Sequence, residues 1–253
     1  MNLDFTGKRV LVTGASSGIG AAAAVMFGQA GATVGVHYNS GRKNAEQVAQ
    51  QITDAGADAV TLQADLTDEQ ACIDTVNNFH QQAGGLNVLV NNAGALLKRC
   101  PVEDVDVKLF DDTLRVNVIS AFVCTRAAIP HLRNSDDGNV IFLSSIATRI
   151  GPPNSLPYAA AKSALNGMTM CFARELAPDK IRCNAVAPGV IDTPLHAATP
   201  AERMNQLKPN ILLGRLGSSE ETASAIVYLA SPAAVYITGE CIEVNGGLHM
   251  RSN

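Results

Sequence analysis

Short apolar runs, rich in valine, leucine and isoleucine, alternate along the chain with longer segments that are rich in alanine. Several of these runs are apolar at nearly every position, which is typical of parallel strands covered on both faces. Such strands, alternating with helices, predict one doubly wound parallel sheet of about seven strands, an α/β fold. The expected strands are 9–13, 33–37, 59–63, 88–91, 139–144, 182–187 and 241–244, and the expected helices are 18–30, 42–55, 68–83, 108–133, 156–177 and 219–230.

No linker, change of composition or low-complexity stretch divides the chain, so we expect a single domain over residues 1–253. One long irregular segment, at about 192–217, carries Pro194, Pro200 and Pro209. Because a loop of this length inside a compact domain is more often functional than a mere connection, we expect it to form a lid.

Composition excludes several classes of function. The formal net charge of −4 gives no electrostatic reason to expect nucleic acid or an anionic membrane as a partner. No apolar run approaches the ~18 residues that cross a bilayer, and residues 1–9 lack a signal-peptide core, so we expect a cytoplasmic protein. The six cysteines and five histidines are scattered singly, so no metal site is expected.

Three glycines follow the first expected strand, in Thr13-Gly14-Ala15-Ser16-Ser17-Gly18-Ile19-Gly20. Glycines at a strand-to-helix turn let the backbone approach a pyrophosphate, and the helix N-terminus then offers N–H groups. Their place at the first such turn predicts a dinucleotide site, although glycines at a turn also occur for structural reasons alone.

The end of the second strand indicates which nicotinamide cofactor fits. An NAD site usually places a carboxylate there, but this strand runs Val36-His37-Tyr38-Asn39-Ser40-Gly41-Arg42 without one. Amide, hydroxyl and guanidinium donors suit a 2′-phosphate, so Asn39, Ser40 and Arg42 favour NADP(H). The alternative is that Arg42 and Lys43 merely begin a solvated helix.

Tyr158 and Lys162 are spaced to share one face of an alanine-rich helix. A lysine charge about 5 Å away, at an effective dielectric of about 20, favours the phenolate by roughly 3 kcal/mol. That is equivalent to roughly two pKa units and brings the phenol, with its ordinary pKa of about 10, into working range. By itself the pair is not diagnostic, because a tyrosine and a lysine one turn apart are common on surfaces.

Taken together, the motifs resemble those of the short-chain dehydrogenase/reductases. The glycine turn, Asn91-Asn92-Ala93-Gly94, Ser145, Tyr158 with Lys162, and Pro188-Gly189 occur in that family's order and spacing. The resemblance extends from Gly7 to Gly247. It implies a single Rossmann-type domain, usually part of a homotetramer, that interconverts a carbonyl and a secondary alcohol with NADP(H) and a small-molecule substrate.

The resemblance also implies roles for individual residues. Tyr158 matches the acid/base, Lys162 the residue that lowers its pKa and bonds the nicotinamide ribose, Ser145 the residue that bonds the substrate oxygen, and Asn117 the residue that holds a water of the proton relay. The expected cofactor contacts are Gly14, Ser16, Ser17, Gly18, Ile19, Gly20, Tyr38, Asn39, Ser40, Arg42, Asp65, Leu66, Asn91, Ala93, Gly94, Tyr158, Lys162, Pro188, Gly189, Ile191 and Thr193.

Three alternatives stay open at this point. The chain resembles 3-oxoacyl-carrier-protein reductases and sugar (glucose-type) dehydrogenases as well as ketone reductases, and a dinucleotide-binding regulatory protein without turnover would share the fold. Acidic residues at 134–137 and 178–180 weigh against an acyl-carrier partner, whereas Arg133 and Lys180 keep that partner open. An apolar substrate pocket under a lid at 195–213 is expected from Leu96, Leu97, Ile146, Leu195, Leu207 and Ile211, some of which are equally compatible with the core.

Overall fold

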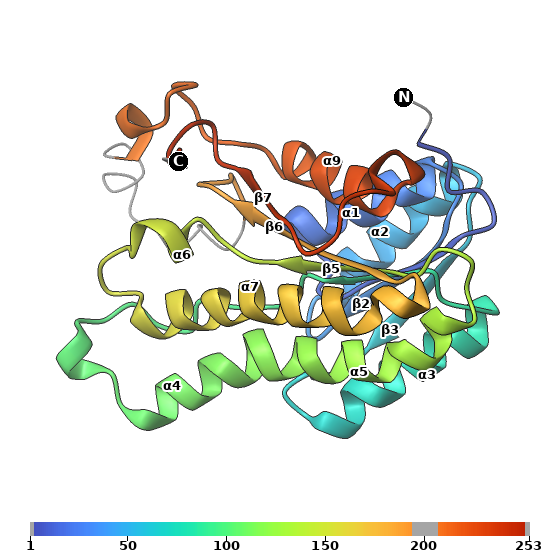
Figure 1. The fold of residues 1–253 in the computed structure, drawn as a ribbon, viewed down its shortest axis with the longest axis horizontal. Helices are drawn as coiled ribbons and strands as arrows, with labels where there is room; N and C mark the ends of the chain where they lie inside the picture. The colour runs from blue at the N-terminus through green and yellow to red at the C-terminus, as the bar shows by residue number, and fades with distance from the viewer. Residues whose placement is uncertain (1–2, 194–206, 251–253) are drawn as a thin grey trace.

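The structure is a computed structural model that describes residues 3–193 and 207–250, and these form one parallel sheet between two layers of helices (Figure 1). The strand order is β3-β2-β1-β4-β5-β6-β7, and every neighbouring pair is parallel. Each expected strand is confirmed to within one residue at either end. The strands are β1 (Arg9–Val12), β2 (Thr33–Tyr38), β3 (Ala59–Gln63), β4 (Val88–Asn91), β5 (Asn139–Leu143), β6 (Arg182–Pro188) and β7 (Cys241–Val244).

Helices cover both faces of the sheet, as Figure 1 shows. One layer contains α1 (Gly18–Gln29), α2 (Arg42–Asp54) and α9 (Ser219–Ala230), and the other contains α3 (Glu69–Ala83), α5 (Ser120–Arg133) and α7 (Leu156–Leu176). Two separate hydrophobic clusters fill the space between sheet and helices. The doubly wound architecture is therefore confirmed.

Strand β1 illustrates why the strands are apolar at almost every position. Val10 and Val12 belong to the cluster on one face of the sheet, whereas Leu11 belongs to the cluster on the other face. All three are fully buried. Because successive side chains point to opposite faces, a strand covered on both sides must be apolar throughout.

The helix expected at 108–133 is not continuous. It consists of α4 (Val107–Leu114), a π-helical turn at Arg115–Ile119, and α5. In the wide turn the Asn117 side chain donates to the Thr113 carbonyl at 3.0 Å, where it competes with backbone N–H groups for that acceptor. Single π-helical turns inside α-helices are frequent at functional sites.

Two further segments differ from the sequence-based expectation. A one-turn helix, α6 (Ala147–Ile150), follows β5 where none is expected. The expected lid at 192–217 falls largely on residues 194–206, which lie outside the described residues. Its described remainder includes a short 3-10 helix at Lys208–Asn210.

Candidate active site

A cavity of about 1210 Å³ lies at the carboxyl ends of the strands, beside the point where the strand order reverses between β1 and β4. Ligands of doubly wound sheets bind at such a switch point. The volume exceeds the ~300–1,000 Å³ of a typical small-molecule pocket, so a dinucleotide and a substrate can share it. Its nucleotide end is lined by Gly14, Ser16, Ser17, Gly18, Ile19, His37, Asn39, Ser40, Gly41, Asp65 and Leu66, and its catalytic end by Ala93, Gly94, Leu96, Arg99, Ser144, Ser145, Ile146, Ser155, Tyr158, Lys162, Pro188, Gly189, Ile191, Thr193 and Leu207.

The turn between β1 and α1 leaves no room for side chains at Gly14 and Gly20. Gly14 and Gly18 have φ angles of +63° and +56°, in the left-handed region that favours glycine. A Cβ atom at Gly20 would overlap the Asn92 amide and the Gly14 carbonyl oxygen. Ser17, the N-cap residue of α1, makes no side-chain capping bond, so the first N–H groups of the helix suit a phosphate. The turn therefore fits the pyrophosphate of a dinucleotide.

Two polar side chains fasten this turn to the sheet. Asn92 Nδ2 donates to the carbonyls of Thr13 and Gly14, both at 2.9 Å. His37 Nδ1 accepts from the Gly14 N–H at 3.0 Å, so its ring proton sits on Nε2, which bonds to the Ala64 carbonyl. Burial lowers the pKa of His37 to about 4, which keeps the ring neutral for this role. The sequence analysis missed His37, although a histidine inside an apolar strand is a visible signal.

The residues expected to select NADP(H) divide into two groups. Asn39 and Ser40 line the cavity, whereas Tyr38 is buried in the core and Arg42 Nε is 2.8 Å from Glu46 Oε1 on the exposed face of α2. Arg42 is therefore part of a solvated helix start in this structure, because an acidic residue lies four positions further along the same helix. Asp65 and Leu66 line the cavity as expected, with Asp65 Oδ1 accepting from the Thr67 N–H at 3.0 Å.

At the catalytic end, α7 presents Tyr158 and Lys162 on one face, as their spacing predicts. Lys162 Nζ lies 5.7 Å from the centroid of the Tyr158 ring. It donates to the Leu143 carbonyl at 2.8 Å, and the lysine is only 4% exposed. The ammonium group is thus held beside the phenol by the end of β5.

In this arrangement the pKa of Tyr158 lies above its ordinary value, and the expected effect of Lys162 on it stays a prediction. Burial raises the pKa of Tyr158 above its ordinary value, while a hydrogen bond with Ser145 and the charge of Arg99 offset only part of that rise. Burial also lowers the pKa of Lys162 to about 8. The simple distance argument omitted desolvation, which is the largest influence on the pKa of both groups.

The two serines at the end of β5 have different partners. Ser144 is buried, and its hydroxyl donates to the Lys162 carbonyl at 3.3 Å. Ser145 hydrogen-bonds with Tyr158, and its Oγ accepts from the Ala147 N–H at 3.1 Å. The geometry therefore brings Ser145, rather than Ser144, against the phenol.

Asn117 lies behind the cavity wall instead of lining it. Its Oδ1 accepts from the Ala95 N–H at 3.2 Å, and its Nδ2 donates to the Ala95 carbonyl at 2.8 Å. A Cβ atom at Gly94 would lie 2.5 Å from Asn117 Oδ1 and 3.1 Å from Lys162 Nζ. The π-helical turn therefore brings Asn117 next to Lys162, with Gly94 filling the narrow space in front of them.

Some residues that were expected to line the cavity do not line it. Asn91 points away from the cavity and donates to Thr125 Oγ1 at 2.9 Å, because alternate residues of β4 face opposite sides. Leu97 is exposed and Ile211 is buried, and neither lines the cavity. Leu195 lies outside the described residues.

The acidic loops do not bear on the entrance of the site. Residues 134–137 and 178–180 precede β5 and β6, so they lie at the amino edge of the sheet, opposite the cavity. There Asp137 Oδ2 is 2.8 Å from Lys8 Nζ, and Asp179 Oδ2 is 2.8 Å from Arg133 Nε. The argument that these carboxylates disfavour an acyl-carrier partner is therefore wrong.

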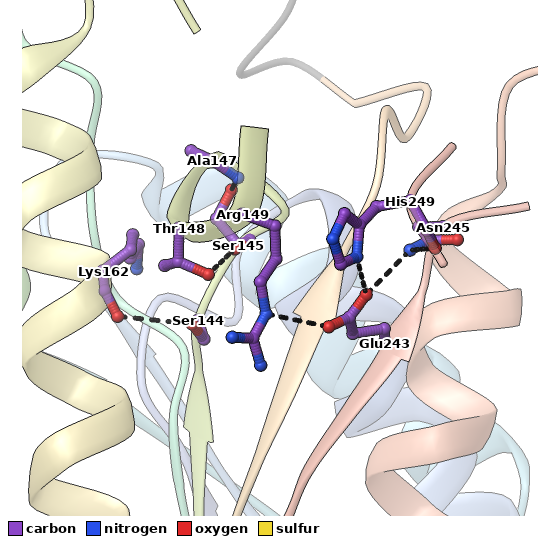
Figure 2. A network of polar contacts seen from close by, with 9 residues as sticks. All are labelled: Ser144, Ser145, Ala147, Thr148, Arg149, Lys162, Glu243, Asn245 and His249. Carbon is purple, nitrogen blue, oxygen red and sulfur yellow. Dashed lines mark hydrogen bonds and ion pairs between the residues drawn. The ribbon is translucent and has the colours of Figure 1, made fainter. Parts of the chain in front are cut away.

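A polar network that the sequence analysis missed supports α6 (Figure 2). Glu243 on β7, with a side chain only 11% exposed, accepts from Arg149 Nε at 2.9 Å and lies 3.0 Å from His249 Nδ1. Asn245 Nδ2 also donates to it at 3.1 Å. Burial raises the pKa of Glu243, but hydrogen bonds from His249 and Arg149 outweigh burial and leave that pKa below its ordinary value. Because Ala147 and Ile150 of α6 line the cavity, this network holds part of the cavity wall.

Two other predictions concern absences. Among the described residues, no three histidine, cysteine or acidic side chains gather in a way that would hold a metal ion. Within residues 3–193 and 207–250, no helix combines the length and hydrophobicity needed to cross a membrane.

Comparisons with known proteins agree with this geometry. Residues 14–249 match the family model described as enoyl-(acyl carrier protein) reductase. The uncharacterized oxidoreductase YgfF of Escherichia coli (strain K12) is 40% identical over 94% of this chain and 98% of its own length. The 3-oxoacyl-[acyl-carrier-protein] reductase FabG of Staphylococcus aureus (strain Mu50 / ATCC 700699) is 37% identical over 96% and 98%. Cis-4-hydroxycyclohexanecarboxylate dehydrogenase of Sinomonas cyclohexanicum is 35% identical over 96% and 97%.

Solved structures match over the same extent. A dehydrogenase/reductase from Sinorhizobium meliloti 1021 superimposes with a TM-score of 0.93 and 34% identity over 98% of both chains. A short-chain dehydrogenase from Burkholderia cenocepacia J2315 in complex with NADP gives a TM-score of 0.92 and 34% identity over 96% of this chain and 98% of its own.

Proposed function

The chain belongs to the short-chain dehydrogenase/reductase family, oxidoreductases of alcohol and carbonyl groups that bind a nicotinamide dinucleotide, and we propose that it is an NADP(H)-dependent reductase of ketones. One observation carries the proposal. The cavity joins a phosphate-sized glycine turn at one end to Tyr158, Ser145 and Lys162 at the other. Hydride transfer coupled to proton transfer needs both ends in one space.

In this proposal Tyr158 is the proton donor of the reduction. Its pKa is raised above the ordinary value, so the phenol is protonated at neutral pH and can donate to a carbonyl oxygen. The hydrogen bond with Ser145 positions the phenolic oxygen, and Lys162 and Asn117 form the polar wall behind it. When bound, the nicotinamide supplies the hydride.

Replacing Tyr158 with phenylalanine tests this assignment, because it removes only the hydroxyl. We expect kcat for NADPH-dependent ketone reduction to fall by about 10²–10⁴-fold, the usual contribution of a positioned acid. NADPH affinity, measured by fluorescence titration, should change little. A variant that retains more than a tenth of wild-type kcat would refute the role of Tyr158.

The preference for NADP(H) rests on the end of β2, where Asn39 and Ser40 line the cavity and residues 38–42 include no carboxylate; the carboxylate that lines the nucleotide end, Asp65, follows β3 instead. A carboxylate at the end of β2 would bond the 2′-hydroxyl of NAD and repel a 2′-phosphate. The related Burkholderia structure contains NADP, which supports the same choice. We expect kcat/KM to be at least tenfold higher with NADPH than with NADH, and Asn39→Asp to reduce that ratio. A wild-type preference for NADH would contradict the proposal.

The FabG relatives favour a second candidate, reduction of 3-oxoacyl thioesters on an acyl carrier protein. The two candidates are separated by comparing kcat/KM for free ketones with that for an acetoacetyl thioester of acyl carrier protein. A dinucleotide-binding regulatory protein is the remaining alternative. It would bind NADPH and reduce neither kind of substrate.

Two family expectations remain part of the proposal. We infer a homotetramer, supported by the exposed apolar side chains of Phe122 on α5 and Met170 on α7, two helices that lie side by side in Figure 1, and of Ile119, which ends the π-helical turn before α5. Light scattering on the purified protein measures that state. We also infer that the single domain of 1–253 closes a lid at about 192–217 over the substrate, supported by Leu207 in the cavity wall.

A further inference from the structure

Arg99 lies in the wall of the cavity, in the loop between β4 and α4, and has no role in the proposed hydride and proton transfers. Its Nη1 donates to Ser155 Oγ at 2.6 Å. Ser155 is only 1% exposed and is the N-cap residue of α7, three positions before Tyr158. The guanidinium is therefore held next to the start of the catalytic helix.

The loop that carries Arg99 is fixed by the backbone as well. The Cys100 N–H donates to the Asn154 carbonyl at 3.2 Å, which ties residues 99–100 to the segment before α7. Ser155 Oγ in turn donates to the Pro153 carbonyl at 3.3 Å. Because each partner is itself anchored, the orientation of the guanidinium is defined by the fold.

The charges around the cavity are unevenly distributed. Among the described residues that line it, Arg99 and Lys162 are the cations, and both lie at the catalytic end. The lining carboxylate, Asp65, lies at the nucleotide end. Arg99 is close enough to the phenol for its charge to act on Tyr158. A substrate that reaches Tyr158 therefore enters a region of positive potential.

Apolar side chains line the cavity near Arg99 in the sequence and near its partner. Leu96 lies three positions before Arg99, and Pro152 and Pro153 lie just before Ser155. An arginine that emerges from such a wall matches a carboxylate in particular, because the planar guanidinium donates two parallel N–H groups to the two carboxylate oxygens. The low polarity of the surroundings strengthens that pairing relative to water.

Building on the proposed function, we propose that the substrate is an oxo acid with an apolar body. Arg99 binds its carboxylate, and Tyr158 donates a proton to its carbonyl oxygen. Arg99 is then the residue that determines substrate specificity. The carboxylate takes no part in the reaction and serves to orient the carbonyl.

The alternative is that Arg99 only supports α7 through Ser155. In that case its loss would affect every substrate equally, whether charged or neutral. The test therefore compares each acid with its own neutral ester, which differs at the carboxylate and keeps the same carbonyl.

The experiment measures kcat/KM with NADPH for acetoacetate, levulinate and 4-acetylbenzoate and for the methyl ester of each. The wild-type protein is compared with Arg99→Gln, Arg99→Lys and, as a matched control, Lys98→Gln, since Lys98 is exposed and does not line the cavity. We expect the wild type to prefer at least one acid over its ester by tenfold or more. Arg99→Gln should lower kcat/KM for that acid by roughly ten- to a hundredfold and leave its ester within about threefold.

The control variants sharpen this result. Lys98→Gln should behave like the wild type, and Arg99→Lys should retain part of the preference, because it keeps the charge and loses the planar fork. Esters reduced as well as acids throughout the series would overturn the inference. So would equal losses for acid and ester in Arg99→Gln, or a wild-type preference for the N-acetylcysteamine thioester of acetoacetate over every acid.

A binding measurement separates this inference from the proposed function. Benzoate, which has no ketone, should bind to the NADPH complex of the wild type and of Tyr158→Phe, and about tenfold more weakly to that of Arg99→Gln. Benzoate binding that is insensitive to Arg99→Gln overturns the inference even if ketones are reduced. Arginine-dependent benzoate binding without any ketone reduction upholds the carboxylate-binding role of Arg99, and then the proposed function and the oxo acid as substrate are wrong.

Discussion

The two ends of the cavity are built in different ways. At the nucleotide end, the chain offers mainly backbone, in a turn where glycines leave no space for side chains and Asn92 and His37 secure the carbonyl and N–H groups. At the catalytic end, side chains from the β4–α4 loop, the π-helical turn, the end of β5 and α7 meet. The first end depends on local backbone shape, whereas the second depends on charges that the fold holds out of water.

The two ends also differ in what they cost the free energy of folding. A backbone turn that binds phosphate costs the free protein little, because its N–H groups can bond to water. Buried charges such as the Lys162 ammonium are expensive to desolvate. We therefore expect substitutions at the catalytic end to separate activity from stability, and substitutions at the nucleotide end to lower both.

The largest effect is expected from Lys162→Met, which removes the buried charge at nearly constant volume. Turnover should fall by about a hundredfold or more, since the polar wall behind Tyr158 is lost. Burial lowers the pKa of Lys162 to about 8, below the 10.5 of an exposed lysine. Its cost to folding is therefore fully present below pH 8 and disappears as the pH rises towards 10.5.

The measurement for Lys162→Met is urea unfolding at pH 7 and at pH 10.5. Removing the charge gains no more than about 3 kcal/mol at pH 7, part of which is offset by the unsatisfied Leu143 carbonyl. We expect a net stabilisation on the order of 1 kcal/mol at pH 7 and a destabilisation at pH 10.5. A variant that is less stable by the same amount at both values would contradict the contrast between the two ends.

The next largest effect is expected from Gly20→Ala at the nucleotide end. The added methyl group would overlap the Asn92 amide and the Gly14 carbonyl, so the turn must open. Such overpacking costs about 1–3 kcal/mol in the free energy of unfolding, and NADPH should bind at least tenfold more weakly. Gly167→Ala is the matched control, since a Cβ atom at Gly167 in α7 would have no heavy atom within 4 Å. Thermal unfolding and NADPH titration of both variants check this, and unchanged NADPH affinity in Gly20→Ala would count against the role of the turn.

The smallest effect is expected from Glu243→Gln, which weakens the network behind α6 without touching the cavity. The loss of ionic hydrogen bonds to Arg149 and His249 should cost roughly 1–3 kcal/mol in the free energy of unfolding. Because α6 lines the substrate part of the cavity, KM for the ketone should rise a few-fold while NADPH affinity stays constant. Glu240→Gln, an exposed residue just before β7, should change neither quantity. If Glu243→Gln changed NADPH affinity a few-fold and left KM for the ketone unchanged, the network would act on the nucleotide end of the cavity, which contradicts this prediction.

The sequence predicts the sheet well because fully covered strands must be apolar at every position, and the ends of such runs are sharp. It also points to Tyr158 and Lys162, whose spacing along one helix is local, whereas Ser145 follows from the resemblance to the family. The pKa balance at Tyr158 was not predictable, since desolvation depends on residues that only the folded chain brings together. The pair of Arg149 and Glu243, which lie 94 positions apart, leaves no local pattern at all.

Two other expectations have different limits. Arg42 was expected to contact the cofactor because other donors stand beside it at the end of β2. In this structure its partner is Glu46, one helical turn later, so the contact stays a prediction. The acidic loops were assigned to the site entrance although the expected topology already puts the loops that precede strands at the opposite edge. The π-helical turn has no sequence signature beyond an asparagine inside a helix.

The order of the strands also has a consequence for synthesis on the ribosome. The four strands of the nucleotide end are complete once residue 91 has been made, whereas Glu243, which secures the wall of the catalytic end, follows 152 residues later. At about 5–20 residues per second, these events are separated by roughly 8–30 s. A nascent chain therefore passes through a long interval in which it has the strands for binding a dinucleotide but not the machinery for using it.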